Sequence, residues 1–166
     1  MDAGLSRQAS QLTSTQIGAV GEAVVAGGLI LASAGQLAPF KPFADDDGTD
    51  LLLFDKLTKR AVPLQIKCRM KVDDTAAQTV QFDVRLKTLA QEGRGFILAV
   101  LLEGMAVRTA WFIPAQELMG IARATPTKLI IVASAKPDSQ DRFRPFRHES
   151  LASVAQALLV PTGLAQ

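Results

Sequence analysis

A long, almost uncharged segment near the N-terminus constrains this chain more than any other feature. Between Arg7 and Lys41 a single side chain, Glu22, carries a charge, within the run TSTQIGAVGEAVVAGGLILASAG. Apolar residues continue almost all the way round a helix drawn through this run, which is typical of a helix covered by its neighbours. Threonine and serine at its start can cap it, and Gly35 can close it in the left-handed conformation. The segment therefore predicts a buried helix.

Two features of this helix predict close neighbours. Its glycines, at positions 18, 21, 27 and 28, each cost up to about 1 kcal/mol against alanine in a helix interior, so they indicate close approach of another backbone. The second feature is Glu22, because an ionised carboxylate among apolar groups is costly unless a cation, a hydrogen-bond network or water meets it. Either Glu22 faces a narrow solvent stripe or the fold brings a partner to it.

Length and composition predict one globular domain. The chain has 166 residues, of which 48% are hydrophobic, enough for one core. We expect the domain to span 13–160, with a flexible N-terminus over 1–12 and a tail over 161–166. The first residues lack a secretory signal, and the most apolar run, Ala23 to Ala32, is too short to span a bilayer, so we expect a cytoplasmic protein without a membrane partner.

The soft metal ligands are few. One cysteine, Cys68, excludes an intramolecular disulfide, and one histidine, His148, leaves too few soft ligands for a structural zinc site. Any metal would therefore be held by oxygen atoms. Up to Arg60 there are 5 Lys or Arg against 7 Asp or Glu, and from Ala61 onward 13 against 9, which suits a metal site beside a phosphate-binding surface.

The remaining patterns predict a mixed α/β fold. The prolines of QLAPFKPF favour an extended segment, followed by the acidic turn Asp45-Asp46-Asp47-Gly48. We expect a hairpin from 49–55 and 61–69, in which Pro63 demotes part of the second strand or marks a bulge. Further strands are expected at 80–86, 95–102, 107–113 and 128–134. A short helix starting with Pro114 as its first residue and an amphipathic helix over 149–159 complete the pattern.

The predicted hairpin carries polar groups in defined positions. Asp50 stands at the entrance of the strand Leu51-Leu52-Leu53, as a turn residue or as a group aimed into a cleft. Because side chains alternate along a strand, Gln65 and Lys67 share one face, while the residues between and before them point to the other.

Together these residues resemble the PD-(D/E)XK, or restriction-endonuclease-like, nuclease superfamily. The matching stretches are Gly18-Ala19-Val20-Gly21-Glu22, Asp47-Gly48-Thr49-Asp50-Leu51 and Leu64-Gln65-Ile66-Lys67, in the order of that family. The chain is most similar to its QxK variants, the Mrr-type and related uncharacterised nuclease-like families, and the later stretch Trp111-Phe112-Ile113-Pro114 is similar to a strand-to-helix step in those families. The resemblance extends from about Gln16 to Arg69. It implies an α/β fold with a central mixed β-sheet flanked by helices.

The resemblance also implies a catalytic site of Glu22, Asp50, Gln65 and Lys67. Asp50 would bind Mg²⁺ or Mn²⁺ directly and Glu22 directly or through water, with the Gln65 amide oxygen or the Ile66 carbonyl as a further ligand. Lys67 would position the attacking water and offset the developing charge. Such a site suits magnesium, which prefers oxygen ligands and retains several waters.

Gln65 departs from the acidic form of this motif and leaves alternatives open. A neutral amide makes the site one negative charge poorer. The expected function is a metal-dependent endonuclease that hydrolyses DNA phosphodiester bonds in restriction, repair or mobile-element processes. The alternatives are an inactive nucleic-acid-binding module with the nuclease fold, and a small α/β interaction protein in which the motif is accidental. Asp47 is a further candidate for contact with the metal or its waters.

Basic residues after the motif are candidates for contact with DNA. Arg69 and Lys71 follow the site strand, and Arg142, Arg144 and Arg147 are interleaved with aromatic residues in RFRPFRH. The favoured interpretation of that stretch is burial of Phe143 and Phe146, with the arginines in water. Nucleases of this size often act as homodimers because two strands need two active sites, but the sequence identifies no interface.

Overall fold

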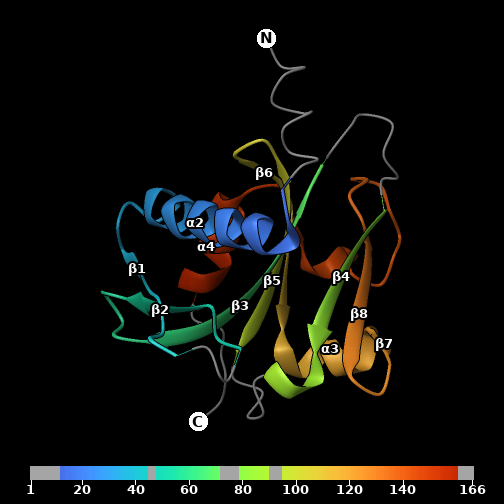
Figure 1. Cartoon of the computed structure of the whole chain (residues 1–166). Coiled ribbons are helices and arrows are strands. Elements are labelled where there is room, and N and C mark those ends of the chain that lie inside the picture. Colours follow the sequence, from blue (N-terminus) through green and yellow to red (C-terminus); the bar gives the residue numbers. More distant parts are fainter. Residues whose placement is uncertain (1–11, 45–47, 72–78, 90–94, 161–166) are drawn as a thin grey trace.

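Helical and strand patterns alternate along this chain, and the result is a mixed α/β domain (Figure 1). The computed structural model describes residues 12–44, 48–71, 79–89 and 95–160. Its helices are α2 (Ser14–Ala32), α3 (Ala115–Ile121) and α4 (Leu151–Leu159), with short 3-10 helices η1 (Leu86–Thr88) and η2 (Arg144–Phe146). Its strands are β1 (Leu37–Phe40), β2 (Leu51–Asp55), β3 (Ala61–Met70), β4 (Thr79–Arg85), β5 (Phe96–Glu103), β6 (Ala106–Pro114), β7 (Arg123–Ala124), β8 (Lys128–Ser134) and β9 (Arg147–His148). The predicted helices and strands are confirmed, whereas β7 and β9 were not predicted.

The central sheet is mixed, as expected. Its strand order is β1-β2-β3-β5-β6-β9, and β3 and β5 are the one parallel pair in it. The predicted β2–β3 hairpin pairs Leu51 with Leu64 and Leu52 with Pro63. Pairing of β3 with β5 begins at Leu64, so Pro63 lies just before β3 gains its second neighbour, where a missing N–H costs little.

A second sheet was not foreseen by the sequence patterns. It has the order β4-β8-β7, and Thr79 to Arg85 pair antiparallel with Ser134 to Lys128. This sheet packs over one face of the central sheet, and α2 and α4 pack over the other (Figure 1). The strand β3 therefore lies between two layers of different composition.

The helix α2 begins and ends as its sequence predicts. Thr13 caps it in a capping box with Gln16, and Gly35 has a φ of +80° after its last turn. Its buried residues are Gly21, Val25 and Leu29. By length and composition alone α2 could cross a membrane; here it packs against β3 and α4.

Two of the four helical glycines mark close packing. A Cβ at Gly21 would lie 2.6 Å from both Cβ and Sγ of Cys68 on β3, and one at Gly28 would overlap Leu151 of α4. A Cβ at Gly18 or Gly27 would meet nothing within 4 Å. Close neighbours are therefore present at positions 21 and 28, although they are side chains and not the predicted backbone, and the prediction is wrong at 18 and 27.

Two hydrophobic clusters fill the faces of the central sheet. The cluster under α2 and α4 includes Val25, Leu64 and Ile66, and the cluster under the β4–β8–β7 sheet includes Phe82, Ile97 and Trp111. Adjacent residues of one strand thus belong to different cores, because side chains alternate along it. This assignment fixes the side of the sheet on which each site residue lies.

Several predicted boundaries differ from the observed ones by one or two residues, as at the start of α4 and at Pro114. Pro114 is the N-cap of α3 and the last residue of β6, so the first helical residue is Ala115. A proline pairs at the end of β6 without cost, because this outer position needs no further ladder hydrogen bond. The acidic residues 45–47, the segment 1–11 and the tail 161–166 lie outside the described residues.

Candidate metal centre

Asp50 is held by both neighbours of Gln65. Its backbone N–H donates to the Leu64 carbonyl at 3.0 Å, and its Oδ2 accepts the Ile66 N–H at 2.5 Å. The carboxylate thus replaces a backbone acceptor where β2 begins. The aspartate predicted at the strand entrance is directed at the QIK stretch.

The Ile66 carbonyl lies on the same side of β3 as this carboxylate. In a strand, the N–H and C=O of one residue face the same neighbouring strand. The Ile66 N–H faces Asp50, so its C=O lies on that side too. Two of the expected oxygen donors, one carboxylate and one backbone carbonyl, therefore lie on the β2 side of β3.

The Gln65 amide is buried and half-satisfied. Its residue is 7% exposed, and its Nε2 donates to Thr88 Oγ1 at 3.2 Å. Its Oε1 is buried and, among the described residues, has no hydrogen-bond partner. Gln65 lines a small pocket with Gly48, Thr49 and Thr88, with space for roughly one water molecule. An unpaired buried amide oxygen costs about 1–3 kcal/mol, which a ligand could offset.

Lys67 lies on the same face as Gln65, away from α2. Cys68 contacts α2 at Gly21, so Lys67 and Arg69 point toward the second sheet. Arg69 confirms this direction, because its Nε donates to the Gln81 carbonyl of β4 at 3.0 Å. The Lys67 side chain is half-buried, and none of the ion pairs within the described ranges involves it.

The segment from β4 to η1 runs beside β3 in the opposite direction. Gln65 contacts Thr88 at one end, and Arg69 contacts Gln81 at the other. Lys67, between Gln65 and Arg69 on the same face, therefore faces the middle of this segment. The hydrogen bond from Lys128, at 2.5 Å, lowers the pKa of Asp83, with Gln81 and the Arg69 charge acting in the same direction against burial. Asp83 is thus an ionised residue beside Lys128 and Arg69 that no sequence pattern indicated.

Glu22 has an ion-pair partner, one of the two alternatives that its sequence environment left open. Its Oε2 accepts from Lys41 Nζ at 2.7 Å, and the Glu22 side chain is 25% exposed. Lys41 follows Phe40, which pairs with Leu52, so this ion pair lies at the end of β1 and β2 where Asp50 stands. However, α2 covers the face of β3 opposite to Lys67.

The structure thus brings part of the predicted constellation together directly. Hydrogen bonds join Asp50 to Leu64 and to Ile66 of the QIK stretch, and Gln65 and Lys67 share a face. Glu22 approaches from the helix on the other face, and no contact joins it to the other three within the described ranges. In the part of the chain that the structure describes, no three His, Cys, Asp or Glu side chains form a cluster that could hold a metal. A cation here would depend on amide and carbonyl oxygens.

The predicted DNA-contacting residues lie in two separate places. Lys71, after β3, pairs with Glu103 at 3.0 Å, near the Arg69 contact to β4. Arg142 donates to the Ile121 carbonyl at 3.1 Å and Arg144 to Gln140 at 2.6 Å, both around η2. The contact of these residues with DNA stays a prediction.

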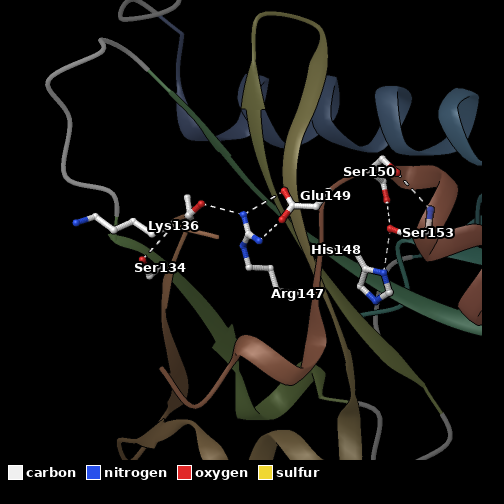
Figure 2. A network of polar contacts seen from close by, with 8 residues as sticks. Ser134, Lys136, Arg147, His148, Glu149, Ser150 and Ser153 are labelled. Carbon is white, nitrogen blue, oxygen red and sulfur yellow. Dashed lines mark hydrogen bonds and ion pairs between the residues drawn. The ribbon is translucent and has the colours of Figure 1, made fainter. Parts of the chain in front are cut away.

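Arg147 is more enclosed than a residue in water. Its side chain is 9% exposed, and its guanidinium contacts Glu149 and donates to the Ala135 carbonyl at 2.9 Å (Figure 2). Phe143 is 2% exposed and Phe146 packs against the same core, so the favoured burial of the two aromatic residues is confirmed. The expectation that the arginines lie in water is wrong for Arg147, because Arg147 pairs with Trp111 in the central sheet and its guanidinium contacts Ala135 and Glu149.

His148 and Cys68 have structural roles in the fold. His148 Nδ1 lies 3.1 Å from Ser153 Oγ, whose own proton goes to the Ser150 carbonyl, so the imidazole is the donor (Figure 2). Burial lowers the pKa of His148. Burial raises the pKa of Cys68 to about 11, against the small opposing effect of the Arg69 charge, so this thiol stays protonated at neutral pH.

Sequence reasoning missed two residues beside Gln65. Thr88 accepts the Gln65 amide N–H, and nothing in the sequence around η1 marks it. Gly48 has a φ of +78°, and a Cβ there would lie 2.8 Å from Gln65 Nε2. The acidic turn indicated a glycine turn position at Gly48 but not this contact.

The comparisons with known proteins concern the fold. The sequence matches no protein-family model and no curated protein. Among solved structures, a bacterial homing endonuclease is similar with a TM-score of 0.55 and 16% sequence identity, over 87% of this chain and 93% of that chain. A Holliday junction resolvase from the archaeal hyperthermophile Archaeoglobus fulgidus gives a TM-score of 0.45 and 14% identity, over 76% and 96% of the two chains.

The fold is therefore of the restriction-endonuclease type. The single α/β domain, with a central mixed sheet covered by α2 and α4 on one face and by the second sheet on the other, shares its fold with the homing endonuclease structure over most of its length. This confirms the fold class expected from the sequence. A fold alone does not define an activity, which must be argued from the site.

Proposed function

We propose that this protein is a metal-dependent endonuclease that hydrolyses DNA phosphodiester bonds. The observation that carries the proposal is the arrangement on β3. Asp50 bonds to Ile66, the Gln65 amide oxygen is buried without a partner among the described residues, and Lys67 follows on the same face. The similarity to a homing endonuclease structure supports a nuclease activity.

The oxygen atoms present fit a hard divalent cation. An orphaned Gln65 Oε1, the Asp50 carboxylate and the Ile66 carbonyl are the donor types that Mg²⁺ or Mn²⁺ accepts, and few protein ligands suffice because such cations retain waters. When bound, the cation would supply charge stabilisation to the phosphate that is attacked.

Lys67 would act on the water and on the developing charge. Its ammonium has no carboxylate partner within the described ranges, so it could contact an anionic ligand without breaking an ion pair there. Placed two residues after Gln65 on the same face, it would orient the attacking water and offset negative charge on the phosphate oxygens.

Glu22 would act at the edge of the site, directly or through water. The Lys41 ammonium now holds its carboxylate at 2.7 Å. A cation that recruits Glu22 would compete with or share this ion pair, which is partly exposed and of small net stability. Loss of Glu22 should therefore affect metal affinity more weakly than loss of Asp50.

DNA would be contacted by two groups of basic residues, one beside the site and one around η2 and β9. Arg69 and Lys71 continue β3 beyond Lys67, and Arg142, Arg144 and Arg147 are the second group proposed. A homodimer would supply one active site for each strand of a duplex. The DNA contacts and the homodimer are proposed in addition to the metal centre.

Cleavage by a charge-matched pair of variants tests the function. Purified protein is incubated with plasmid and branched DNA in Mg²⁺, Mn²⁺ or EDTA. We expect metal-dependent cleavage by the wild type and a loss of at least about 100-fold for Lys67→Ala, since preorganised charge at a phosphate contributes on this scale. The control, Lys136→Ala, removes the same charge from an exposed position outside the site. Equal cleavage by Lys67→Ala and the control would contradict the role of Lys67.

The neutral Gln65 favours one second candidate, an inactive DNA-binding module. A site one negative charge poorer holds metal less tightly. This candidate predicts DNA binding without cleavage in any divalent metal, and binding that Asp50→Ala leaves unchanged. The enzyme predicts that Asp50→Ala abolishes cleavage.

A further inference from the structure

The buried amide of Gln65 has a defined orientation. Thr88 Oγ1 donates its one proton to the Arg85 carbonyl at 3.2 Å. Toward Gln65 it can therefore act only as an acceptor, which requires the NH₂ group of Gln65 to face it. The amide oxygen must then face the other way, where it has no partner among the described residues.

Gly48 lies close to the same pair of residues. With a φ of +78°, it holds a conformation that favours glycine. A Cβ there would overlap the Thr88 carbonyl and lie 2.5 Å from Thr88 Cβ and 2.8 Å from Gln65 Nε2. The backbone of the turn before Asp50 therefore closes the space in which the amide could rotate.

We propose that Thr88 is a positioning residue that turns the Gln65 amide oxygen toward the cation. This inference rests on the proposed function, because it assigns a direction to one of its metal ligands. The arrangement also accounts for glutamine where the resemblance allows an acid. A hydroxyl whose proton is committed to Arg85 accepts an amide N–H, whereas an ionised glutamate would present a second acceptor to it.

Mn²⁺ binding to the full chain tests this inference without relying on cleavage. Titration followed by electron paramagnetic resonance or calorimetry is carried out on wild type, Thr88→Val and Thr88→Ser. Valine keeps the shape and removes the acceptor, and serine retains the hydroxyl. We expect Thr88→Val to weaken Mn²⁺ binding roughly tenfold, the lower range for loss of a group that orients a metal ligand. The Mn²⁺ affinity of Thr88→Ser should stay within about twofold of that of the wild type. If only the packing of the Thr88 methyl group mattered, Thr88→Ser, which lacks this group, would bind Mn²⁺ more weakly.

A second readout reports the amide itself. In the metal-free wild type, the Gln65 side-chain NH₂ signals in nitrogen-15 NMR spectra should exchange slowly with solvent, and Thr88→Val should accelerate their exchange while backbone signals stay dispersed. Equal exchange in both proteins, or wild-type Mn²⁺ affinity in a folded Thr88→Val, would overturn the positioning role alone. Absence of Mn²⁺ binding by the wild type would overturn the proposed function together with this inference.

Discussion

The two faces of strand β3 are used differently. On the α2 side, Leu64 and Ile66 are buried in a continuous apolar core, and Cys68 contacts the helix at Gly21. On the other side, Gln65 is buried with an oxygen that has no partner within the described residues, and Lys67 follows it. Burial of apolar side chains on the α2 face stabilises the fold. Burial of an unpaired amide oxygen on the other face costs part of that stability. Residues one position apart therefore serve stability and chemistry separately.

The largest expected difference lies between Leu64 and Gln65. Leu64→Ala should lower the free energy of unfolding by about 2–5 kcal/mol, because it leaves a cavity in a fully buried site. Gln65→Met should leave stability unchanged or raise it by up to about 1 kcal/mol, because it removes the unpaired amide oxygen. Urea denaturation measures both. A loss in Gln65→Met equal to that in Leu64→Ala would break the comparison.

Two glycines, one packed against each face of β3, sharpen the comparison between these faces. Gly21→Ala would press on Cys68, and Gly48→Ala on Thr88. Each should cost about 1–3 kcal/mol of stability, the first reduced by the better helix propensity of alanine. Gly48→Ala alone should also weaken Mn²⁺ binding, since it displaces Thr88 and Gln65. A matched fall in Mn²⁺ affinity in Gly21→Ala would show that the faces are not independent.

The smallest effect concerns Cys68 on the apolar side. Its raised pKa, about 11, means that the folded state holds the proton more tightly than the unfolded state. This contribution to stability is fully present below pH 9 and is lost as the pH rises from about 9 to 11.

Denaturation against pH measures this contribution. Wild type should lose stability across that window, and Cys68→Ala should show a smaller slope there. Alkylation by iodoacetamide at pH 8 should also be slow in the native protein, because the reactive thiolate is scarce. Rapid alkylation of the folded protein would contradict the burial of this thiol.

Local sequence patterns predicted the structural features that depend on short-range interactions. The uncharged run and its cap at Thr13 gave α2, and alternation placed Gln65 and Lys67 on one face of β3. The need of Glu22 for a partner was also predictable, although its partner, Lys41, was not, because that contact depends on where β1 ends.

The remaining features depend on contacts between distant segments. The second sheet arises from pairing of Thr79–Arg85 with Lys128–Ser134, and no turn signal joins such strands. Thr88 becomes relevant only because this sheet brings η1 beside Gln65. Arg147 has the sequence pattern of a solvent-exposed basic residue. Its enclosure depends on a contact with another segment, because the Ala135 carbonyl accepts its N–H.

A manganese anomalous map of the crystallised protein tests the central claim most directly. Crystals are soaked in Mn²⁺, and the anomalous signal locates the ion independently of any assumed chemistry. The account predicts a peak bounded by the Asp50 carboxylate, the Ile66 carbonyl and Gln65 Oε1, with the Lys67 ammonium beside it. A peak elsewhere, or none at this position at millimolar Mn²⁺, would contradict it.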